Sequence, residues 1–471
     1  MAPYKRLING IKKILNPNKS FKEEIHPESA LQVGGTANHV PTRIPRAEHN
    51  ISRRHISKNA LKVLYQLHKA GYQALLVGGS VRDMLLGRKP KDFDIATNAH
   101  PDQVRQLFRN CRLIGKRFVL AHVYFGREII EVATFRTGHE QAESHEGSTR
   151  DGQIVRDNVY GTIDEDAWRR DFTINALYYD ISDFNVVDYA DGMADLEAGL
   201  LRLIGDPILR YQEDPVRMLR AARFAAKLDL GIEAHTEAPI YKLGSLLENI
   251  PPARLYEEVL KLFLTGHARQ SLAQLLKYDL FKYLFPYTQS HFDNDPYALK
   301  MVEHALANTD ERIEQNRSVT PAFLLAALLW PALSHLLPEY REQGYSEQDA
   351  IITATRKLLN KQTKHVVIPR RISTVIQEIW LLQPRLTRRK NKAALKVMQN
   401  IRFRAGYDFL ILRQQSGEPL EDWVTWWTQA QSRDTSERPQ FEDNKPRKRF
   451  KRSRKPRKKM DMDTANVAKP S

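Results

Sequence analysis

Cysteine is almost absent from this sequence, since Cys111 is the only one among 471 residues. A single cysteine cannot form an intramolecular disulfide or a cysteine-based zinc site, so we expect a reduced, cytoplasmic protein. Long apolar runs are also missing: none approaches the ~20 residues of a membrane-spanning helix, which argues against an integral membrane protein. At roughly 100–200 residues per domain, the length predicts two to four globular domains.

Acidic residues are too few to balance the basic ones, and the net charge is +17. The excess is concentrated near the C-terminus, where residues 445–459 hold eleven Lys and Arg and no acid. Such a run attracts a polyanion, and the composition of residues 433–471 predicts a disordered basic tail. We expect this tail to contact RNA phosphates, through residues that include Arg447, Lys448, Arg449, Lys451 and Arg452.

The first 54 residues form a predicted N-terminal arm and linker. Apolar residues recur at helical spacing from Leu7 to Leu15, with lysine and arginine between them. This pattern predicts a short surface helix or a disordered arm, and weak attachment to an anionic membrane surface is the alternative.

Residues 55–205 alternate between helical and strand patterns. Helices are predicted at 57–70, 81–86 and 101–108, and strands at 73–77, 93–96, 118–125 and 128–135. The order predicts an α+β domain with a small mixed sheet. The polar stretch 137–160 is predicted to be a loop beside the functional site.

Beyond residue 205 the strand signals fade and amphipathic helices follow one another. They are predicted at 212–228, 252–265, 268–284, 297–314, 320–336, 346–360 and 370–382. We therefore expect a helical neck at 206–290 and a helical body at 291–432, ahead of the tail.

Two carboxylates flank Phe93 on the predicted strand. Side chains at i and i+2 of a strand point to the same side, so Asp92 and Asp94 are expected to converge. Two close carboxylates repel unless a cation lies between them, and hard divalent cations such as Mg²⁺ or Mn²⁺ take such oxygen ligands. The pair is thus a candidate divalent-metal site.

A glycine turn lies fourteen residues before this pair. The strand at 73–77 ends in Gly78, Gly79 and Ser80, and a helix follows. Glycines let a ligand approach the backbone, a helix N-terminus favours an anion, and Arg82 adds a cation. A phosphate cradle beside a divalent-metal site suits phosphoryl or nucleotidyl transfer.

At this point the sequence resembles a known group. The run LLVGGSVRDMLLGRKPKDFDIAT at 75–97 resembles the signature of the nucleotidyltransferase superfamily, and within it the bacterial poly(A) polymerases and CCA-adding tRNA nucleotidyltransferases. Three more motifs of that group follow in order: EVATFR (131–136), RRDFTINAL (169–177) and EDPVRMLRAARFAAKL (213–228). The resemblance implies a polymerase-beta-like head followed by a helical neck and body.

The resemblance also implies roles for single residues. Asp92 and Asp94 match the metal-binding carboxylates, and Asp171 matches a further active-site acid. Glu131 is a rival for this third position; we rank it below Asp171, although the sequence does not separate the two. The positions that match nucleotide contacts are Gly79, Ser80, Arg82, Arg170, Asp214, Arg217, Arg220 and Arg223, with ATP as the implied substrate.

Which polymer is made depends on other features. The run LIGKRFVLAH at 113–122 resembles a signature of the poly(A) polymerases, and Lys116 and Arg117 within it are candidate phosphate contacts. With the basic tail, this favours template-independent adenylation of RNA 3′ ends. The expected partners are RNA and possible RNA-decay proteins, and not DNA. The alternatives are CCA addition to tRNA and an RNA-binding protein with an inactive head.

Overall fold

The computed structural model describes residues 40–115, 119–137, 159–388 and 396–432, with short backbone stretches at 149–150 and 153–154. The N-terminal arm before residue 40, Lys116, Arg117 and the tail from 433 lie outside these residues, so the predictions for them stay predictions. The chain divides into one compact unit ending at Val424 and a second beginning at Thr425. All features below belong to the first unit.

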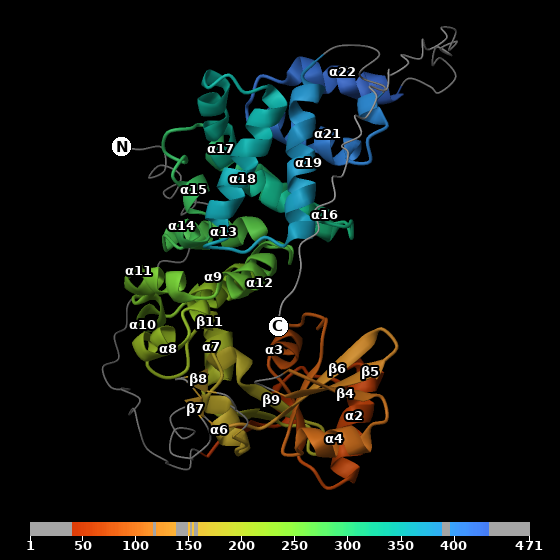
Figure 1. Ribbon diagram of the computed structural model, residues 1–471. Coiled ribbons are helices and arrows are strands. Elements are labelled where there is room, and N and C mark those ends of the chain that lie inside the picture. Colours follow the sequence, from red (N-terminus) through yellow and green to blue (C-terminus); the bar gives the residue numbers. More distant parts are fainter. Residues whose placement is uncertain are drawn as a thin grey trace, which may run out of the picture. The chain divides into compact units, whose positions relative to one another are not determined.

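An eight-stranded sheet forms the head, in the order β1-β10-β9-β2-β3-β6-β5-β4 (Figure 1). The pairing of β3 with β6 is parallel, and the other pairs are antiparallel. The strands are β1 (Thr42–Ile44), β2 (Ala74–Val77), β3 (Asp94–Thr97), β4 (Cys111–Ile114), β5 (Leu120–Phe125), β6 (Glu128–Thr134), β9 (Leu177–Asp180) and β10 (Val186–Asp188). Two small pairs lie outside this sheet: β7 (Thr149–Arg150) with β8 (Gln153–Ile154), and β11 (Leu200–Leu201) with β12 (Gly231–Ile232).

The helices of the head begin where the sequence offers a cap or a glycine. The Ser57 side chain accepts a hydrogen bond from the Ala60 N–H at the start of α2 (Lys58–Lys69), whose apolar face is buried against the sheet. Gly78 has a φ of +74° and precedes α3, which follows β2 directly. The other head helices are α3 (Gly79–Leu85), α4 (Pro101–Leu107), α6 (Ile163–Trp168) and α7 (Gly192–Ala198).

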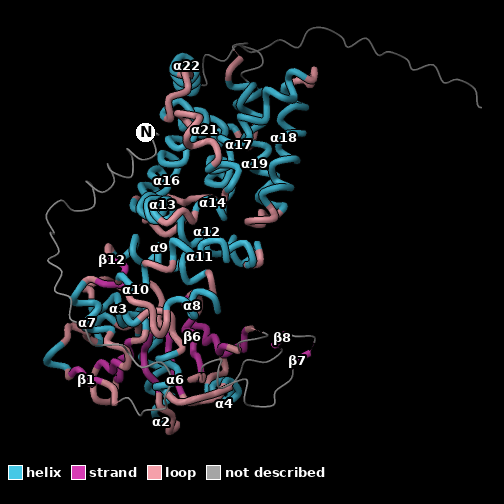
Figure 2. The backbone as a smooth tube through the Cα atoms, turned by 90° about the vertical axis from the view of Figure 1, so that its left-hand side faces the viewer, coloured by secondary structure: helices cyan, strands magenta, loops and turns pink. Residues whose placement is uncertain are grey.

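The helical part begins after β11, and Figure 2 shows strands confined to the N-terminal half of the described chain. One hydrophobic core extends from Phe172 to Leu412, so the expected neck and body share a core. Its helices are α8 (Pro207–Glu213), α9 (Val216–Leu228), α10 (Ala234–Glu237), α11 (Ile240–Leu243), α12 (Pro252–Phe263), α13 (Ala268–Lys277), α14 (Phe281–Leu284), α15 (Pro286–Gln289), α16 (Ala298–Glu314), α17 (Pro321–Glu342), α18 (Glu347–Gln362), α19 (Arg370–Leu386) and α21 (Phe403–Gln415). The last helix, α22 (Glu421–Ser432), spans the division between the two units.

Several sequence predictions need correction. The helix predicted at 212–228 is two helices, because the chain turns extended at Asp214, before Pro215. The helix predicted at 268–284 breaks at Asp279, which has a φ of +56°. Asp92 lies two residues before β3, not on it. The strands β1, β4, β9 and β10 and the helix α21 had no predicted counterpart.

Helix α17 is, among the described residues, the one long and apolar enough to cross a membrane. Most of its apolar side chains are buried in the helical core, and 67% of its most apolar window is buried. This burial is that of a central core helix, and α17 packs against α16, α18 and α19.

Candidate active site

Acids lie where β3 begins beside β6, although no group of three or more His, Cys, Asp or Glu among the described residues is arranged to hold a metal ion. Phe93 is buried, whereas Asp92 and Asp94 on either side of it are exposed. In the parallel pairing of β3 with β6, the register partner of Asp94 is Glu131. The third acid therefore comes from the neighbouring strand.

The charges around Asp94 are poorly compensated. Partial removal from water and the like charge of Glu131 raise the pKa of Asp94 to about 6, with a smaller contribution from Asp92. The Arg170 guanidinium opposes this shift without cancelling it. A carboxylate whose charge is destabilised by neighbouring acids is a candidate ligand for a cation.

Asp171, the third acid that the resemblance implied, is held in a different manner. Its Oδ1 accepts hydrogen bonds from the Phe172 N–H (2.8 Å) and the Asn175 side chain (3.1 Å). Its Oδ2 forms an ion pair with Arg220 on α9. Burial alone would raise the pKa of Asp171, but Arg220 and these hydrogen bonds lower it below its usual value.

The structure thus gives the two rival acids different surroundings. Glu131 lies in register with Asp94, and its carboxylate is 3.3 Å from the His122 ring. Asp171 joins the head to α9 through Arg220. On this geometry Glu131 is the better candidate for the third metal ligand, which reverses the order in which the sequence ranked them.

The turn between β2 and α3 forms at the predicted glycines, but Gly78 and Ser80 are buried and only Gly79 is partly exposed. A Cβ atom added at Gly78 would lie 3.8 Å from an Arg170 side-chain nitrogen, so the turn and that arginine are close. Gly79 opens α3, and the Ser80 hydroxyl donates to the Val77 carbonyl at 3.3 Å. That bond ties the turn to the end of β2, so in this state the Ser80 hydroxyl has a structural role.

Arg82 is almost fully buried beneath this turn. Its guanidinium donates to the Asn175 side chain (2.5 Å) and to Asp83 (2.6 and 2.9 Å). It also lies over the Phe224 ring, at 5.3 Å from the centroid. These contacts fix the cation beside the N-terminus of α3, where the resemblance placed a triphosphate contact.

Further cations from α9 surround Arg82. Burial, together with the like charges of Arg82, Arg223 and Lys91, lowers the pKa of Lys227 against the opposing effect of Asp83. Arg223 lies over the Phe224 ring at 4.4 Å, and its buried Nε has no hydrogen-bond partner among the described residues. A group of cations that repel one another is ready for a polyanion.

Arg170 is held by a buried network. Its guanidinium donates to Asp166 (2.8 and 3.2 Å) and to the Tyr178 hydroxyl (3.0 Å), and that hydroxyl donates to Asp166 at 2.8 Å. Burial would raise the pKa of Asp166, but Arg170 and Arg169 lower it to about 2. The network keeps Arg170 beside Gly78.

Asp214 and Arg217 lie at the junction between α8 and α9. The Asp214 carboxylate caps the Val216 N–H (3.2 Å) and accepts from Arg254 on α12 (2.6 Å). Arg217 donates to Glu213 (2.6 Å) and to the Arg210 carbonyl (2.7 Å). Asp214, Arg217 and Arg220, all expected on one helix at 212–228, thus start at a helix junction and continue along α9.

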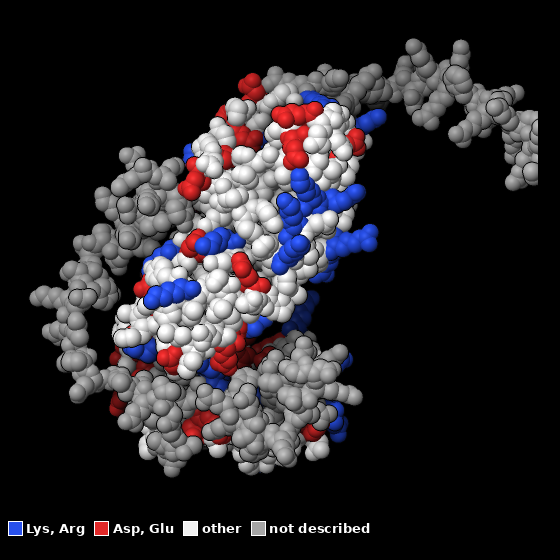
Figure 3. Space-filling view, turned by 60° about the vertical axis from the view of Figure 1, so that its left-hand side comes forward, with Lys and Arg blue, Asp and Glu red and all other residues white. Residues whose placement is uncertain are grey.

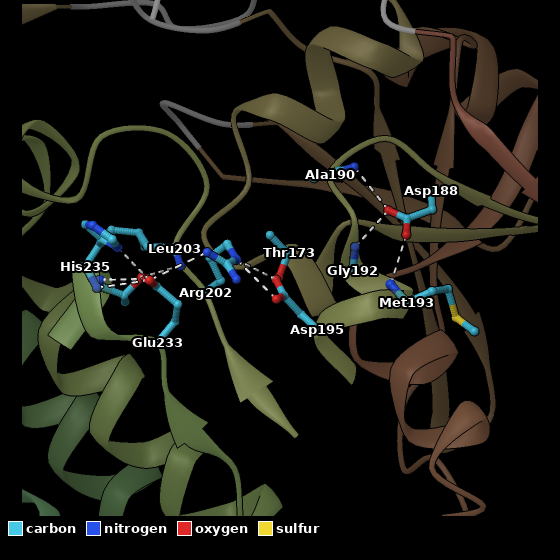
Figure 4. A network of polar contacts seen from close by, with 11 residues as sticks. Thr173, Asp188, Ala190, Gly192, Met193, Asp195, Arg202, Leu203, Glu233 and His235 are labelled. Carbon is cyan, nitrogen blue, oxygen red and sulfur yellow. Dashed lines mark hydrogen bonds and ion pairs between the residues drawn. The ribbon is translucent and has the colours of Figure 1, made fainter. Parts of the chain in front are cut away.

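A second polar network supports the segment that carries Asp171 (Figure 4). Asp195 on α7 accepts from the Thr173 hydroxyl (2.7 Å) and from Arg202 (3.0 and 3.1 Å). Asp188 accepts from three backbone N–H groups, of Ala190, Gly192 and Met193. A Cβ atom at Gly192 would overlap the Thr173 carbonyl, so only glycine fits there.

Sequence reasoning missed several contributors to the site. Asp83 and Asn175, which fix Arg82, and Lys227 on α9 all lie inside quoted motifs but received no role. The signal for Asp83 is its position next to Arg82. Asn175 is 93 residues from its partner, and no local pattern could connect them.

Family profiles match most of the described chain. The profile described as "Poly A polymerase head domain" matches residues 74–202, and "Probable RNA and SrmB- binding site of polymerase A" matches residues 229–292. The profile "Polymerase A arginine-rich C-terminus" matches residues 343–459. The first of these spans the carboxylates, the glycine turn and Asp171.

Solved structures with a similar fold are nucleotidyltransferases. The CCA-adding enzyme of Bacillus stearothermophilus in complex with CTP has a TM-score of 0.53 and 25% identity, covering 79% of this chain and 80% of that one. A CCA-adding enzyme in complex with ATP has a TM-score of 0.57 and 21% identity, covering 83% and 85%. These likenesses confirm the expected fold class, a nucleotidyltransferase head with a mixed sheet followed by helices.

Curated relatives align over nearly the whole chain. Poly(A) polymerase I of Salmonella typhimurium is 48% identical over 96% of this chain and 98% of its own length. Poly(A) polymerase I of Haemophilus influenzae is 46% identical over 88% and 94%. The CCA-adding enzyme of Lactobacillus helveticus is 39% identical but aligns with 45% of this chain. The chain belongs to the poly(A) polymerase family of nucleotidyltransferases.

Proposed function

We propose that this protein adds AMP from ATP to RNA 3′ ends without a template and releases pyrophosphate. One observation carries the proposal: Arg170 lies close to the glycine turn before α3 and acts on the charge of Asp94, so the acids at β3 and β6 and the cations around α3 and α9 are near one another. The acids suit a divalent metal, and the cations suit a triphosphate. Membership of the poly(A) polymerase family supports this reading.

Asp92, Asp94 and Glu131 would hold the metal, with Mg²⁺ or Mn²⁺ as the proposed ion. Their oxygen donors fit a hard divalent cation, and the raised pKa of Asp94 indicates that Arg170 does not fully balance the charge of this acid. When bound, the metal supplies charge stabilisation and lowers the pKa of an attacking hydroxyl.

The protein's own side chains hold the nucleotide. Arg82 and Arg223 provide fixed positive charge for the triphosphate and for the departing pyrophosphate, and Lys227 adds a third cation. These groups are oriented before the substrate arrives, so little reorganisation is needed during the reaction. Arg170, fixed by Asp166 beside Gly78, balances part of the acidic charge near Asp94.

Base recognition is assigned to the junction of α8 and α9. An aspartate accepts and an arginine donates, so Asp214 and Arg217 together can complement the edge of a base. Both side chains already have protein partners, in Arg254 and Glu213. Asp171 and Arg220 lie near this junction and connect it to the head.

CCA addition remains the alternative activity. It is disfavoured because alignment with poly(A) polymerases extends over 96% of this chain, whereas the quoted CCA-adding relative aligns with 45%. An RNA-binding protein with an inactive head is disfavoured because Asp92, Asp94 and Glu131 are all present, and acids beside a polyanion hinder simple binding.

One assay tests the proposal. The purified protein is incubated with Mg²⁺ and one nucleoside triphosphate at a time, with either an unstructured oligoribonucleotide or a tRNA that ends before its CCA. We expect long tails from ATP alone on the generic RNA. Addition of two cytidines and one adenosine to the tRNA alone would overturn the proposal in favour of CCA addition.

The cellular setting is also a proposal. Cys111 is a free cysteine, which fits the cytoplasm. There we propose a role in mRNA processing and turnover, with RNA-decay proteins as partners. Membrane-surface attachment through the first 39 residues concerns a part of the chain outside the described residues.

A further inference from the structure

A stretch of α18, the following loop and the start of α19 is strongly basic. Residues 350–377 contain six Lys and Arg and no acid. Five of these side chains have no carboxylate within ion-pair distance among the described residues. We call these five the body strip: Arg356, Lys361, Lys364, Arg370 and Arg371.

The body strip is exposed and on one side of the helical part. All five side chains belong to exposed residues. The space-filling view shows lysine and arginine side chains gathered on one part of the surface, below a group of acidic ones (Figure 3). Exposed cations without partners attract a polyanion at a distance and are screened by salt.

The loop that carries Lys364 is joined by hydrogen bonds to α14 and α12. The Gln362 side chain donates to the Leu284 carbonyl (2.7 Å), and both groups are buried. The Val367 N–H donates to the Pro252 carbonyl (3.2 Å) at the start of α12. Arg254, two residues later, pairs with Asp214 at the junction of α8 and α9. A short path of contacts therefore connects the body strip to the proposed base-recognition residues.

Aromatic rings lie beside Lys361 of the body strip. The Lys361 ammonium lies over the Tyr287 ring at 5.5 Å from its centroid, and the His365 ring meets Tyr287 edge-on at 5.9 Å. Tyr287 is half-buried. Cations beside a partly exposed aromatic ring are typical of surfaces that bind single-stranded nucleic acid, because bases stack on the ring while the backbone meets the charges.

We propose that the body strip, with Tyr287, binds the single-stranded RNA upstream of the 3′ end that is being extended. The proposal rests on the proposed function, since it assigns a path to the RNA of that reaction. The path leads from Asp214 across the start of α12 to α18 and α19. An anionic membrane and an acidic protein also match the charge, but the Tyr287 group favours RNA.

The test uses the full chain and a variant with four neutral substitutions: Lys361→Gln, Lys364→Gln, Arg370→Gln and Arg371→Gln. Its matched control is Arg54→Gln, Lys58→Gln, Lys62→Gln and Lys69→Gln, which removes the same charge from exposed residues on and beside α2 of the head. Binding of labelled 10- and 30-nucleotide RNAs is measured by fluorescence anisotropy without ATP, over a series of salt concentrations. Thermal unfolding checks that both variants fold.

For the 30-nucleotide RNA we expect the strip variant to bind roughly 10²-fold more weakly at 0.1 M salt, with a salt slope smaller by about 2 to 3, because each phosphate neutralised on a single strand contributes about 0.7. The control should bind like the unaltered protein. Tyr287→Ala should weaken binding roughly tenfold and leave the salt slope unchanged, as expected for lost stacking.

Three outcomes would overturn the inference. They are an unchanged salt slope in the strip variant, an equal loss in the control, and loss of binding to phosphatidylserine vesicles with RNA affinity retained. Failure of the proposed function is read separately, from whether the unaltered protein extends the 10-nucleotide RNA with ATP.

Discussion

Two groups of acids in this molecule have pKa values that are shifted in opposite directions. At the start of β3, Asp94 lies near Asp92 and Glu131, and its pKa rises to about 6. Around α6, Asp166 lies between two arginines, and its pKa falls to about 2. The protein's own cations balance the charge of Asp94 only in part. The charge of Asp166 is balanced by Arg170 and Arg169. The difference separates acids that act on a ligand from acids that hold the fold.

The largest expected effect comes from removing the uncompensated acids. The double variant Asp92→Ala, Asp94→Ala should lower the rate of AMP addition by about 10³-fold or more, because the metal loses its ligands. Its free energy of unfolding should stay the same or rise, since charge repulsion is removed. Single-turnover rates and urea unfolding measure the two, and Asp102→Asn, an exposed acid on α4, is the control. A double variant that still polymerises would refute the metal assignment.

Removing an acid whose charge the protein balances should instead lower the free energy of unfolding. Asp166→Asn removes the buried carboxylate that the half-buried Arg170 and Arg169 share, which should lower the free energy of unfolding by up to about 3–5 kcal/mol. Glu339→Gln, which removes an exposed pair with Lys357, should cost less than about 1 kcal/mol. Chemical denaturation measures both. Equal losses in the two variants would contradict the contrast drawn above.

The same comparison of reaction rate with stability distinguishes Glu131 from Asp171 as the third metal ligand. Glu131→Gln should slow the reaction by about 10²-fold and leave stability nearly unchanged, because its carboxylate is the proposed third metal ligand and its contact with His122 is partly exposed. Asp171→Asn should lower stability, because Arg220 loses its partner. Reaction rates and unfolding curves of both variants distinguish the two assignments. A stable Asp171→Asn protein that is far slower than Glu131→Gln would restore Asp171 as the third ligand.

The smallest effect is one of pH on metal affinity. The pKa of Asp94 in the metal-free protein is raised from its usual value to about 6, so this acid is ionised above pH 6 and takes up a proton below it. Mn²⁺ affinity should therefore fall as the pH drops through 6, by up to about tenfold per pH unit. Calorimetric titration measures this, and in Asp94→Asn the slope near pH 6 should flatten. A slope that persists in that variant would assign the titration to another group.

The contribution of Asp166 to stability is also lost on acidification, but in a lower pH window. Its folded-state pKa lies below the unfolded value, so its ionised form stabilises the fold. This contribution is fully present above pH 3.8 and is lost as the pH falls towards 2. Acid unfolding of Asp166→Asn should show a weaker dependence on pH in that window.

Local patterns in the sequence predicted the central part of the site. The alternation around Phe93 predicted that Asp92 and Asp94 face one way, and the glycines after β2 predicted a backbone turn before a helix. Ser57 marked the start of α2. Each of these signals is contained within a few residues, where the periodicity of strands and the preferences of caps act directly.

The remainder depends on contacts between distant residues. Glu131 could not be ranked above Asp171 because nothing in the sequence states that β6 lies parallel beside β3. The pair of Asp171 and Arg220 forms only once α9 packs on the head. The strand β9 was missed because Leu177, Tyr178 and Tyr179 are all buried and show no alternation. Pro215, by contrast, was a readable signal for the break that separates α8 from α9.

A substitution at Gly192 would perturb the enzyme without changing any of its reactive groups. A methyl group there would push on the Thr173 main chain, two residues from Asp171, and a rotamer change could not relieve it. Alanine at this position should yield a temperature-sensitive allele, active in cool culture and failing on warming, in a strain whose catalytic side chains are all intact.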